Sequence, residues 1–522
     1  MKMREQAMKR RMETRKLALF LLLGLSLGVL TCFLAVSVFS ANQQFSLTRR
    51  VWADQAEESG GHGSREGILP GIDEHTLDNN ATPAQLDGGA DDNQGISSIA
   101  DAISRLNEKS TSSKDTVTTA ELVAEQKETQ SKQIKEKKSL CDLSNWRTDV
   151  CEMTGDVRIH SNSSSILVLN SKATEESWQI KPYARKFDPS AMQHIKQVSV
   201  RSFSGGDGVV VPVCTVNQTL VPAVVFVIGG YTGNYYHDYT DVLIPLFITT
   251  RQFNGDVQFI ISTRNFWWVD KYKAILKQLS RHEIVYLDGD EQVRCHRRVI
   301  VGLHSHKPMS IDPERTPGGY SMLDFTKLMR VTYGLERDRP MRRAEEKPRM
   351  LLIQRKGTRQ FTNLEEVART AEAAGFAVQV AEAESMTRVA EFARVVNSCD
   401  VMVGLHGAGL TNFVYLPTGA VVVQVIPFGN LETISRGCFK NSSEDAGLRY
   451  LDYSVGVEES SLLEQYPRQH PVFTDPKSIH RQGWKKMGQV YLDHQDVKID
   501  VDRFKPLLLV ALDNLRQYTI ED

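Results

Sequence analysis

A glycine-rich turn in the second half of the chain is the clearest candidate for binding chemistry. Residues 401–412 read Val-Met-Val-Gly-Leu-His-Gly-Ala-Gly-Leu-Thr-Asn, an apolar run that leads directly into glycines. Glycine lets the backbone approach a ligand closely, and the unpaired N–H groups of a following helical turn favour an anion. We therefore predict a phosphate site, with a simple tight turn as the alternative. The expected contact residues are His406, Gly407, Ala408, Gly409, Thr411 and Asn412.

The glycine spacing differs from that of dinucleotide-binding proteins. Gly404, Gly407 and Gly409 do not form a Gly-x-Gly-x-x-Gly pattern. Gln424 stands on the next expected strand, where such proteins place an acidic partner for the ribose. The turn therefore predicts a phosphate ligand without predicting a dinucleotide.

A basic segment follows the first expected strand of the same region. Residues 353–363 read Ile-Gln-Arg-Lys-Gly-Thr-Arg-Gln-Phe-Thr-Asn. Open α/β sheets bind ligands at the carboxyl ends of their strands, and guanidinium groups bind phosphates in a bidentate manner. We predict a diphosphate site here, whereas the alternative is a solvated basic loop. The expected contact residues are Arg355, Lys356, Arg359 and Asn363.

A histidine and an aspartate in the first half are the candidates for proton transfer. Residues 229–247 again read as a strand, a glycine turn and a helix, with His237 and Asp241 four positions apart on one helix face. Histidine and carboxylate side chains can remove a proton from a hydroxyl group at neutral pH. The sequence leaves open which of the two is the base, and whether His237 is instead a structural histidine that binds Asp241.

Short apolar runs alternate with helical periodicity after residue 141, which is typical of α/β units with parallel sheets. Expected strands are residues 223–228, 257–261, 284–287, 299–303, 350–354, 376–380, 401–405 and 420–426. Expected helices are residues 236–253, 266–280, 364–374, 386–397 and 504–518. Asn363, with Glu366 three residues later, is expected to cap one of these helices.

The elements form two sets that are separated by a charged, proline-bounded stretch at residues 336–348, which we interpret as a linker. The expected fold class is α/β, with two facing Rossmann-like domains in the arrangement called GT-B. The first domain, expected to bind the acceptor, covers residues 141–335. The second, expected to bind a nucleotide-sugar donor, covers residues 349–522.

The N-terminal part predicts a membrane anchor. Residues 17–41 are 25 consecutive uncharged, mostly apolar residues, enough to cross a hydrocarbon core of ~30 Å at ~1.5 Å per residue. The preceding tail, residues 1–16, carries seven basic residues against two acidic ones, which predicts a cytosolic N-terminus and a luminal remainder. A cleaved signal peptide is the alternative, although its apolar region would be shorter.

Residues 42–140 are expected to be a disordered luminal stem, because residues 53–140 contain no aromatic residue and no cysteine. The formal net charge of the whole chain is -1. A nucleic-acid-binding protein would need a basic excess, so the composition argues against nucleic-acid partners.

The cysteines and glycosylation motifs agree with a secretory location. Six of the seven cysteines fall in the expected luminal region, where disulfides persist, and Cys141 and Cys151 are the expected local pair. Glycosylation motifs of the Asn-x-Ser/Thr type occur at Asn80, Asn162, Asn217 and Asn441.

Three blocks together resemble the plant-type family 61 glycosyltransferases. They are residues 406–412, residues 355–363, and the segment with Gly233-Asn234, His237, Asp241 and Pro245-Leu246. Residues 295–303 and 268–279 reinforce the similarity, which spans roughly residue 141 to the C-terminus. Within the family, the sequence is most similar to the grass branch that decorates xylan. Gln424 is a departure, because relatives often have Glu at that position.

The resemblance implies an inverting GT-B enzyme of the Golgi membrane, anchored as a single-pass type II protein. It implies transfer of an arabinofuranosyl or xylosyl unit from a UDP-sugar to the xylan backbone of the plant cell wall. No metal or other cofactor is expected.

Other interpretations remain open at this stage. One is a xylosyltransferase or N-acetylglucosaminyltransferase that acts on glycoprotein glycans, and another is a non-catalytic glycan-binding protein with the same fold. Asp288-Gly289-Asp290 also imitates the Asp-x-Asp metal site of GT-A transferases, although a surface turn favours the same residues.

Overall fold

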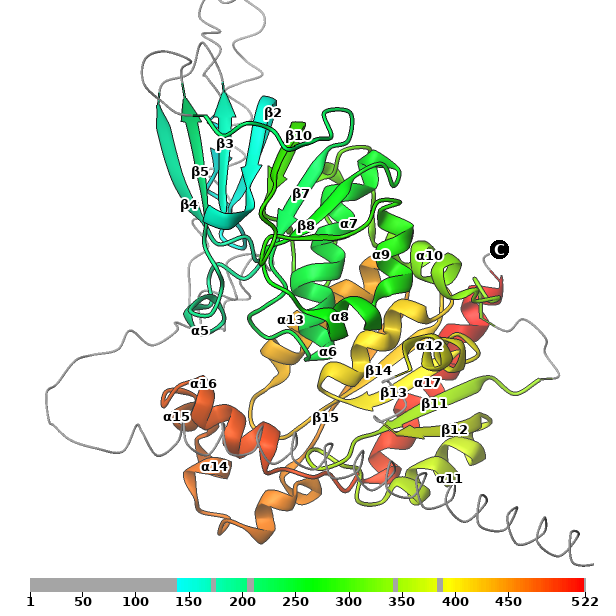
Figure 1. Cartoon of the computed structure of the whole chain (residues 1–522). Helices are drawn as coiled ribbons and strands as arrows, with labels where there is room; N and C mark the ends of the chain where they lie inside the picture. Colours follow the sequence, from blue (N-terminus) through cyan, green and yellow to red (C-terminus); the bar gives the residue numbers. More distant parts are fainter. Residues whose placement is uncertain (1–138, 170–174, 204–210, 341–345, 383–387, 521–522) are drawn as a thin grey trace, which may run out of the picture. The chain divides into compact units, whose positions relative to one another are not determined.

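The computed structural model describes residues 139–169, 175–203, 211–340, 346–382 and 388–520 (Figure 1). The predicted cytosolic tail, the membrane span at residues 17–41, all but the last two residues of the stem, and Asn80 lie outside these ranges. Within the ranges, no helix is both long enough and apolar enough to cross a membrane.

The first half of the described chain contains a mixed ten-stranded sheet. Its strands are β1 (Cys141–Asp142), β2 (Val150–His160), β3 (Ser165–Leu169), β4 (Glu176–Ile180), β5 (Val198–Phe203), β6 (Val216–Asn217), β7 (Ala223–Phe226), β8 (Gln258–Ile261), β9 (Val285–Tyr286) and β10 (Val293–Val301). The main strand order is β4-β5-β3-β2-β10-β7-β8-β9. Strands β10, β7, β8 and β9 are parallel, as the sequence predicted, whereas β2 pairs antiparallel with both β10 and β3.

The extension formed by β1 to β5 was not predicted; its strands pair antiparallel except for β3 and β5, which are parallel. Strand β2 begins with buried residues, but several polar residues in its middle are exposed. Its sequence therefore lacks a regular alternation of apolar and polar residues. Two disulfides lie in this half. One joins the expected pair Cys141 and Cys151 across β1 and β2, and the other joins Cys214 to Cys295 of β10.

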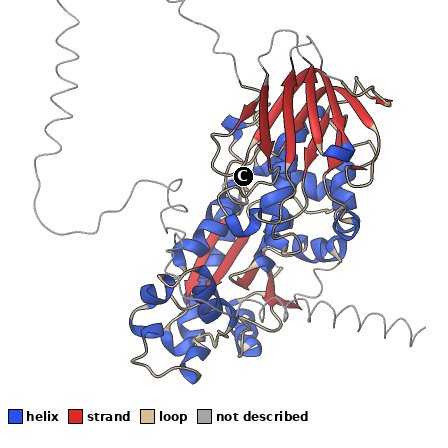
Figure 2. Ribbon diagram, turned by 60° about the vertical axis from the view of Figure 1, so that its left-hand side comes forward, coloured by secondary structure: helices blue, strands red, loops and turns tan. Residues whose placement is uncertain are grey.

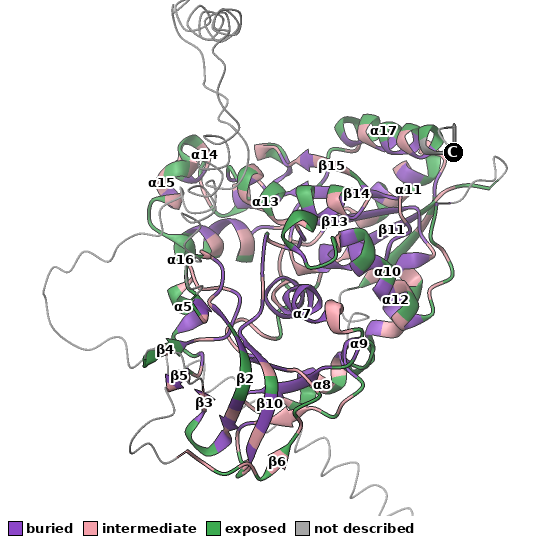
Figure 3. Ribbon diagram, turned by 90° about the horizontal axis from the view of Figure 1, so that it is seen from above, coloured by how far each residue is buried: buried purple, intermediate pink, exposed green. Residues whose placement is uncertain are grey.

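Helices of the first half lie against the parallel strands. They are α5 (Pro189–Met192), α6 (Tyr235–His237), the π-helix η2 (Asp238–Leu243), α7 (Ile244–Thr250), α8 (Phe266–Lys271), α9 (Lys273–Leu279) and α10 (Met322–Tyr333), with 3₁₀ turns η1 (Ser161–Ser163), η3 (Arg251–Phe253) and η4 (Pro313–Arg315). Every residue of α7 is buried, as Figure 3 shows.

The expected helix at 236–253 is present but contains a π-helical turn. Pro245 has no N–H group, so it cannot donate to the carbonyl group of Asp241, four residues earlier, as a regular α-helix requires. The N–H group of Ile244 instead donates to the carbonyl group of Tyr239, five residues earlier. Such turns often occur at functional sites, and this one contains Asp241.

The second half contains a five-stranded parallel sheet in the order β12-β11-β13-β14-β15. The strands are β11 (Arg349–Gln354), β12 (Ala377–Glu382), β13 (Val401–Leu405), β14 (Val421–Ile426) and β15 (Arg449–Ser454). The main helices are α11 (Leu364–Ala374), α12 (Val389–Asn397), the 3₁₀ helix η6 (Ala408–Tyr415), α13 (Glu432–Asp445) and α17 (Val501–Ile520). The predicted bounds of α11 and β13 agree with the structure, but β15 was not predicted.

A further group of short helices follows β15 and was also missed. It comprises η7 (Val457–Glu459), η8 (Ser461–Glu464), α14 (Pro471–Thr474), α15 (Pro476–His480), α16 (Trp484–Met487) and the π-helix η9 (Gly488–Asp493). Each element is too short to give a clear helical period. Figure 2 shows the helices and strands together, and the fold class is mixed α/β, as expected.

The two halves share one hydrophobic core. Side chains of α7, α9 and α10 from the first half pack in the same cluster as side chains of α12 and η6 from the second. Inside this core the hydroxyl group of Tyr415 bonds the hydroxyl groups of Tyr235, at 2.9 Å, and Tyr239. The expected linker also contacts the second half, because Arg337 of the linker forms an ion pair with Asp400.

We predict that Gly302→Ala lowers the stability of the protein more than Gly319→Ala does. Both glycines have positive φ, +89° and +71°, so either change should cost ~1 kcal/mol or slightly more through the backbone. A Cβ on Gly302 would also overlap the carbonyl oxygen of Asp149, whereas nothing lies within 4 Å at Gly319. The overlap should add about 1–3 kcal/mol.

The melting temperatures of the two purified variants, measured side by side by differential scanning fluorimetry, test this difference. Equal melting temperatures would show that the close approach of Gly302 to Asp149 does not constrain the fold.

Candidate active site

The strand order of the second sheet reverses between β11 and β13. From β11 the chain passes outwards to β12 on one side, and it then returns to β13 and continues through β14 to β15 on the other. Open α/β sheets bind ligands at the carboxyl ends of the strands at such a switch point. The basic segment follows β11 and the glycine turn follows β13, so the fold brings these two predicted segments together.

Two arginines and a glycine form the centre of this site. The guanidinium group of Arg355 lies against Gly407, where a Cβ would overlap it, and a Cβ would also lie 3.4 Å from Nη1 of Arg359. Gly407 has φ +147°, a backbone conformation that residues other than glycine rarely adopt. Only glycine therefore allows both guanidinium groups to lie against the turn.

The charges of the two arginines are not neutralised by a close carboxylate. Within the described residues, neither Arg355 nor Arg359 has a carboxylate partner within 4 Å, although the exposed Asp493 acts on both from further away. Burial, together with the charge of Arg355, lowers the pKa of Arg359 to about 10, so the group stays protonated at neutral pH. Two half-buried cations side by side favour binding of an anion with two or more charges.

Arg359 is held in place by the backbone. It has φ +53°, and its Nη1 donates to the carbonyl oxygen of His406 at 3.0 Å. Its Nε is buried and has no hydrogen-bond partner among the residues that the structure describes. An unpaired buried donor costs free energy, so a bound anion that accepted this N–H would remove the cost.

His406 is buried beside the arginines and is bonded to Gln424. The side-chain amide of Gln424 lies 2.7 Å from Nδ1 of His406, and its carbonyl oxygen accepts from the hydroxyl group of Tyr450 at 2.7 Å. With the amide nitrogen facing it, Nδ1 is the acceptor and the ring proton is on Nε2. Burial, with the charges of Arg359 and Arg355, lowers the pKa of His406 to about 3. His406 is therefore a neutral N–H donor.

Two predicted donor contacts have other partners. Nζ of Lys356 pairs with Glu382 on the surface, 2.7 Å from its Oε2. The side chain of Asn363 bonds the N–H and carbonyl groups of Ile499, at 2.9 Å each, and the carboxylate of Glu366. Asn363 occupies the N-cap position of α11, as expected. Its side chain makes no capping hydrogen bond to the helix, so the expected side-chain cap is wrong.

The remaining predicted contacts lie in the turn and in η6. Ala408 is half-buried next to Gly407, whereas Gly409, Thr411 and Asn412 are buried. The side-chain amide of Asn412 donates to the carbonyl oxygen of Gly409 at 2.8 Å, which fixes the first turn of η6. The side chains of Thr411 and Asn412 therefore lie inside the protein, and the half-buried backbone at Gly407 and Ala408 is what a ligand would meet.

His237 and Asp241 form a hydrogen-bonded pair in the first half. Nδ1 of His237 lies 2.8 Å from Oδ2 of Asp241. The Asp241 side chain is fully buried, whereas 16% of the His237 side chain is exposed. A carboxylate that accepts the Nδ1 proton leaves Nε2 with a free lone pair. His237, and not Asp241, is therefore the member of the pair that can contact a bound substrate.

The buried charge of Asp241 is balanced by residues that the sequence analysis missed. Oδ1 lies 3.8 Å from Arg147 and 3.6 Å from Arg185, and Tyr183 donates to Oδ2 at 3.1 Å. Burial acts to raise the pKa of Asp241, but the His237 hydrogen bond and the two arginines outweigh it and keep the pKa below its usual value. These partners come from segments 56–94 positions away, so no local spacing could reveal them.

Aromatic rings connect the pair His237 and Asp241, which we call the dyad, with the site formed by Arg355 and Arg359. The ring of Tyr236 lies 5.4 Å from His237 and 5.5 Å from Phe439 of α13, and Phe439 lies 5.8 Å from His406. In addition, α6 packs directly against η6. The structure thus brings the two predicted sites together across the shared core.

The two carboxylates of the Asp288-Gly289-Asp290 turn have cationic partners. Asp288 lies 2.5 Å from Nζ of Lys196, and Asp290 accepts from Arg294 and Ser161 at 2.8 Å each. Among the described residues, no group of three or more His, Cys, Asp or Glu side chains is arranged to hold a metal ion.

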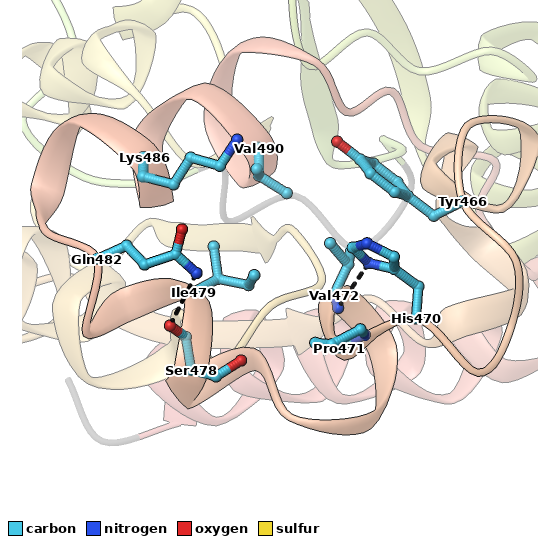
Figure 4. Close-up of a pocket in the computed structure, with 9 residues that line it drawn as sticks. All are labelled: Tyr466, His470, Pro471, Val472, Ser478, Ile479, Gln482, Lys486 and Val490. Carbon is cyan, nitrogen blue, oxygen red and sulfur yellow. Dashed lines mark hydrogen bonds between the residues drawn. The ribbon is translucent and has the colours of Figure 1, made fainter.

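The three glycosylation motifs within the described ranges, at Asn162, Asn217 and Asn441, have exposed asparagines. A cavity of about 350 Å³ lies elsewhere in the second half, between α14, α15 and η9 (Figure 4). Its wall includes Tyr466, whose ring lies 4.7 Å from that of His470. None of the predicted site residues lines it.

Comparison with known proteins gives two findings. The family model described as Glycosyltransferase 61 matches residues 235–423. This segment begins at α6 and ends in β14, so it contains the histidine dyad, the arginine pair and the glycine turn.

Similar proteins also come from two plants. Alpha-1,3-arabinosyltransferase XAT2 of Oryza sativa subsp. japonica is 47% identical over 386 residues, which are 73% of this chain and 65% of the relative. Beta-1,2-xylosyltransferase XYXT1 of the same plant is 43% identical over 72% of this chain and 84% of the relative. Xylan glycosyltransferase MUCI21 of Arabidopsis thaliana is 36% identical over 72% and 80%. The chain thus spans just under two thirds of the length of XAT2.

We predict that Arg355→Ala and Arg359→Ala each weaken the binding of UDP. Each change removes a charge-assisted contact worth about 1.5–3 kcal/mol, and Kd should rise about 10- to 150-fold. Replacement by lysine should restore little, because the fork geometry of the guanidinium group is lost.

Lys356→Ala is the matched control, since it removes a neighbouring positive charge that pairs with Glu382 on the surface. Its effect on Kd should be small, because exposed pairs contribute about 0–1 kcal/mol. Isothermal titration calorimetry with UDP measures all of these values. Equal UDP affinities of the wild type and both arginine variants would show that the diphosphate does not bind at this site.

Proposed function

This chain belongs to the glycosyltransferase 61 family, and from that premise we propose that it transfers a pentosyl residue from a UDP-sugar to xylan. The names of the relatives support this choice of sugar and acceptor, since the relatives include an arabinosyltransferase, a xylosyltransferase and a xylan glycosyltransferase. The observation that carries the proposal is the unneutralised pair Arg355 and Arg359 at the switch point of the second sheet, beside a glycine that admits them.

The donor diphosphate binds between the basic segment and the glycine turn. Arg355 and Arg359 donate to its oxygens, and His406 offers a neutral Nε2–H group. As the bond between the sugar and the diphosphate breaks, negative charge grows on the leaving oxygen. Fixed cations at that position stabilise this charge more in the transition state than in the ground state, which lowers the barrier.

The acceptor hydroxyl attacks the anomeric carbon from the face opposite UDP. Its oxygen forms the new glycosidic bond, the electron pair of the old bond leaves with UDP, and the hydroxyl proton passes to Nε2 of His237. Asp241 keeps the other ring proton on Nδ1 and stabilises the positive charge that the ring acquires. This single displacement inverts the anomeric configuration, and Asp241 acts as a positioning residue.

The proposal includes a GT-B arrangement, in which the first half binds the acceptor and the second half the donor. Two sheets with parallel strands, flanked by helices, support it. It also includes a type II location in the Golgi membrane, with the enzyme part in the lumen. The apolar residues 17–41 and the two disulfides support this location. Localisation of a fluorescent fusion and protease protection in sealed vesicles would test it.

We expect the purified protein to transfer arabinofuranose or xylose from the corresponding UDP-sugar to xylo-oligosaccharides, and to invert the anomeric centre. Mass spectrometry and NMR of the product identify the sugar and the linkage. We also expect transfer to continue in excess EDTA, because the fixed arginines carry out the charge stabilisation.

Transfer to a peptide and not to xylan would support the glycoprotein-directed alternative. UDP binding without transfer to either acceptor would support a non-catalytic glycan-binding protein. Loss of transfer in EDTA, reproduced by the double variant Asp288→Ala, Asp290→Ala, would indicate a metal-dependent enzyme.

We predict that His237→Ala lowers kcat by ~10² to 10⁴, because the variant loses its general base. Binding of UDP should not change, since His237 lies in the other half. Asp241→Asn should also lower kcat and, in addition, destabilise the protein, because Arg147 and Arg185 would lose their buried counter-charge.

The matched control is His282→Ala. His282 lies 2.8 Å from Asp256, as close as the members of the dyad, but this pair is on the surface. Steady-state kinetics should show normal kcat for this control. A folded His237→Ala variant with the same kcat would exclude the dyad from the reaction.

A further inference from the structure

Two neighbouring aromatic side chains are exposed at the start of α8. Phe266 and Trp267 are 63% and 54% exposed, whereas the third aromatic residue of the run, Trp268, is fully buried. Exposed apolar groups of this size often mark a binding surface. One face of Phe266 is partly used, because its ring packs against Tyr286 at 5.2 Å. Trp267 is the one of the two that lies beside the glycine turn before His237.

A buried carboxylate fixes α8 against the glycine turn that precedes the dyad. Oδ1 of Asp238 accepts from the backbone N–H group of Gly233 at 3.0 Å and from Nε1 of Trp268 at 2.8 Å. Oδ2 accepts from the hydroxyl group of Tyr272 at 2.7 Å, and Nζ of Lys271 lies 3.6 Å away. Asp238 itself directly follows His237 in sequence. One side chain thus sets the position of the aromatic run relative to the candidate base.

This anchoring brings Trp267 to the edge of the turn. A Cβ on Gly233 would lie 3.5 Å from Cη2 and 3.8 Å from Cζ2 of Trp267, so the outer edge of the indole ring lies against the glycine. The same turn carries Tyr231, whose ring lies 4.7 Å from His237. Figure 1 shows α8 beside α6. The partly exposed Trp267 and the candidate base therefore both contact the same glycine turn, at Gly233 and Tyr231 respectively.

We propose that Trp267 is an aromatic platform on which a sugar ring of the polysaccharide acceptor stacks, next to the ring that receives the pentosyl unit. The inference rests on the proposed function and specifies how the acceptor binds. A pyranose ring has an apolar face of C–H groups, and a xylose polymer has no charge that the protein could attract. Its binding must therefore depend on apolar contact and hydrogen bonds, and an indole ring offers a large rigid apolar surface.

The platform makes a length-dependent prediction. A short acceptor fills only the position next to His237, whereas a longer one also reaches Trp267. Trp267→Ala should raise the acceptor KM of a long xylo-oligosaccharide roughly five- to fiftyfold, the effect of losing one aromatic contact. It should change the KM of a short one much less. The donor KM and kcat should remain those of the wild type, because neither the arginines nor the dyad is altered.

Two variants accompany this test. Trp267→Phe keeps an aromatic face and should recover much of the acceptor affinity. Trp484→Ala removes a tryptophan of α16 that is 55% exposed, nearly the same fraction, but belongs to the second half. It should leave every acceptor KM unchanged. Because both tryptophans are exposed, thermal unfolding should show folded variants in each case.

A binding measurement separates failure of the platform from failure of the proposed function. Isothermal titration calorimetry of the UDP-saturated full-length protein with xylohexaose gives a Kd without requiring transfer. If the wild type bound xylohexaose but transferred no sugar, the proposed function would fail and the platform would still be tested by the Kd of Trp267→Ala. Equal Kd and equal acceptor KM in wild type and Trp267→Ala would overturn the platform. A wild type that neither bound nor modified xylohexaose would overturn both.

Discussion

A fully buried carboxylate that needs positive partners is the constraint on which the first half depends. Asp241 contacts Arg147 from the loop before β2, Arg185 from the loop after β4, and His237 one helical turn away. An uncompensated charge in a protein interior costs several kcal/mol or more. The antiparallel strands must therefore fold onto the parallel ones before the dyad is stable. In this way the extension of the sheet, which carries no predicted catalytic or donor-binding residue, forms part of the site.

The tyrosine cluster extends this constraint to the second half. Tyr415 of η6 bonds Tyr235 and Tyr239 inside a core to which both halves contribute. Tyr235 begins the helix that carries His237, and Tyr415 ends the helix that begins at the glycine turn. The candidate base and the glycine turn are thus connected through two short helices, α6 and η6. Large rotation of one half against the other would break these buried contacts, so we expect only small closing motions.

The sequence predicted those parts that local pattern encodes. The periods of α11 and β13, and the glycine and arginine segments after parallel strands, were identified because each depends on neighbours in sequence. Arg147, Arg185 and Tyr183 were missed because antiparallel pairing brings them in from far away. Asn363 and Lys356 were assigned to the donor by position; in the structure Asn363 bonds the backbone of Ile499 and Lys356 pairs with Glu382, and their contact with a donor stays a prediction. A residue type at the right strand end does not determine where its side chain points.

The second half combines a neutral histidine, which is bonded to the amide of Gln424, with two positively charged arginines. Burial and the charges of Arg359 and Arg355 lower the pKa of His406 and keep its ring uncharged. The Gln424 amide fixes the ring by a hydrogen bond to Nδ1, and the two guanidinium groups remain protonated throughout the physiological range. The positive charge of the two guanidinium groups is then constant over the mildly acidic to neutral pH range. If the proposed function holds, a change in pH within this range would leave the charge of the donor site unaltered, and it would act on the reaction through the phosphate groups of the nucleotide or through proton transfer in the first half.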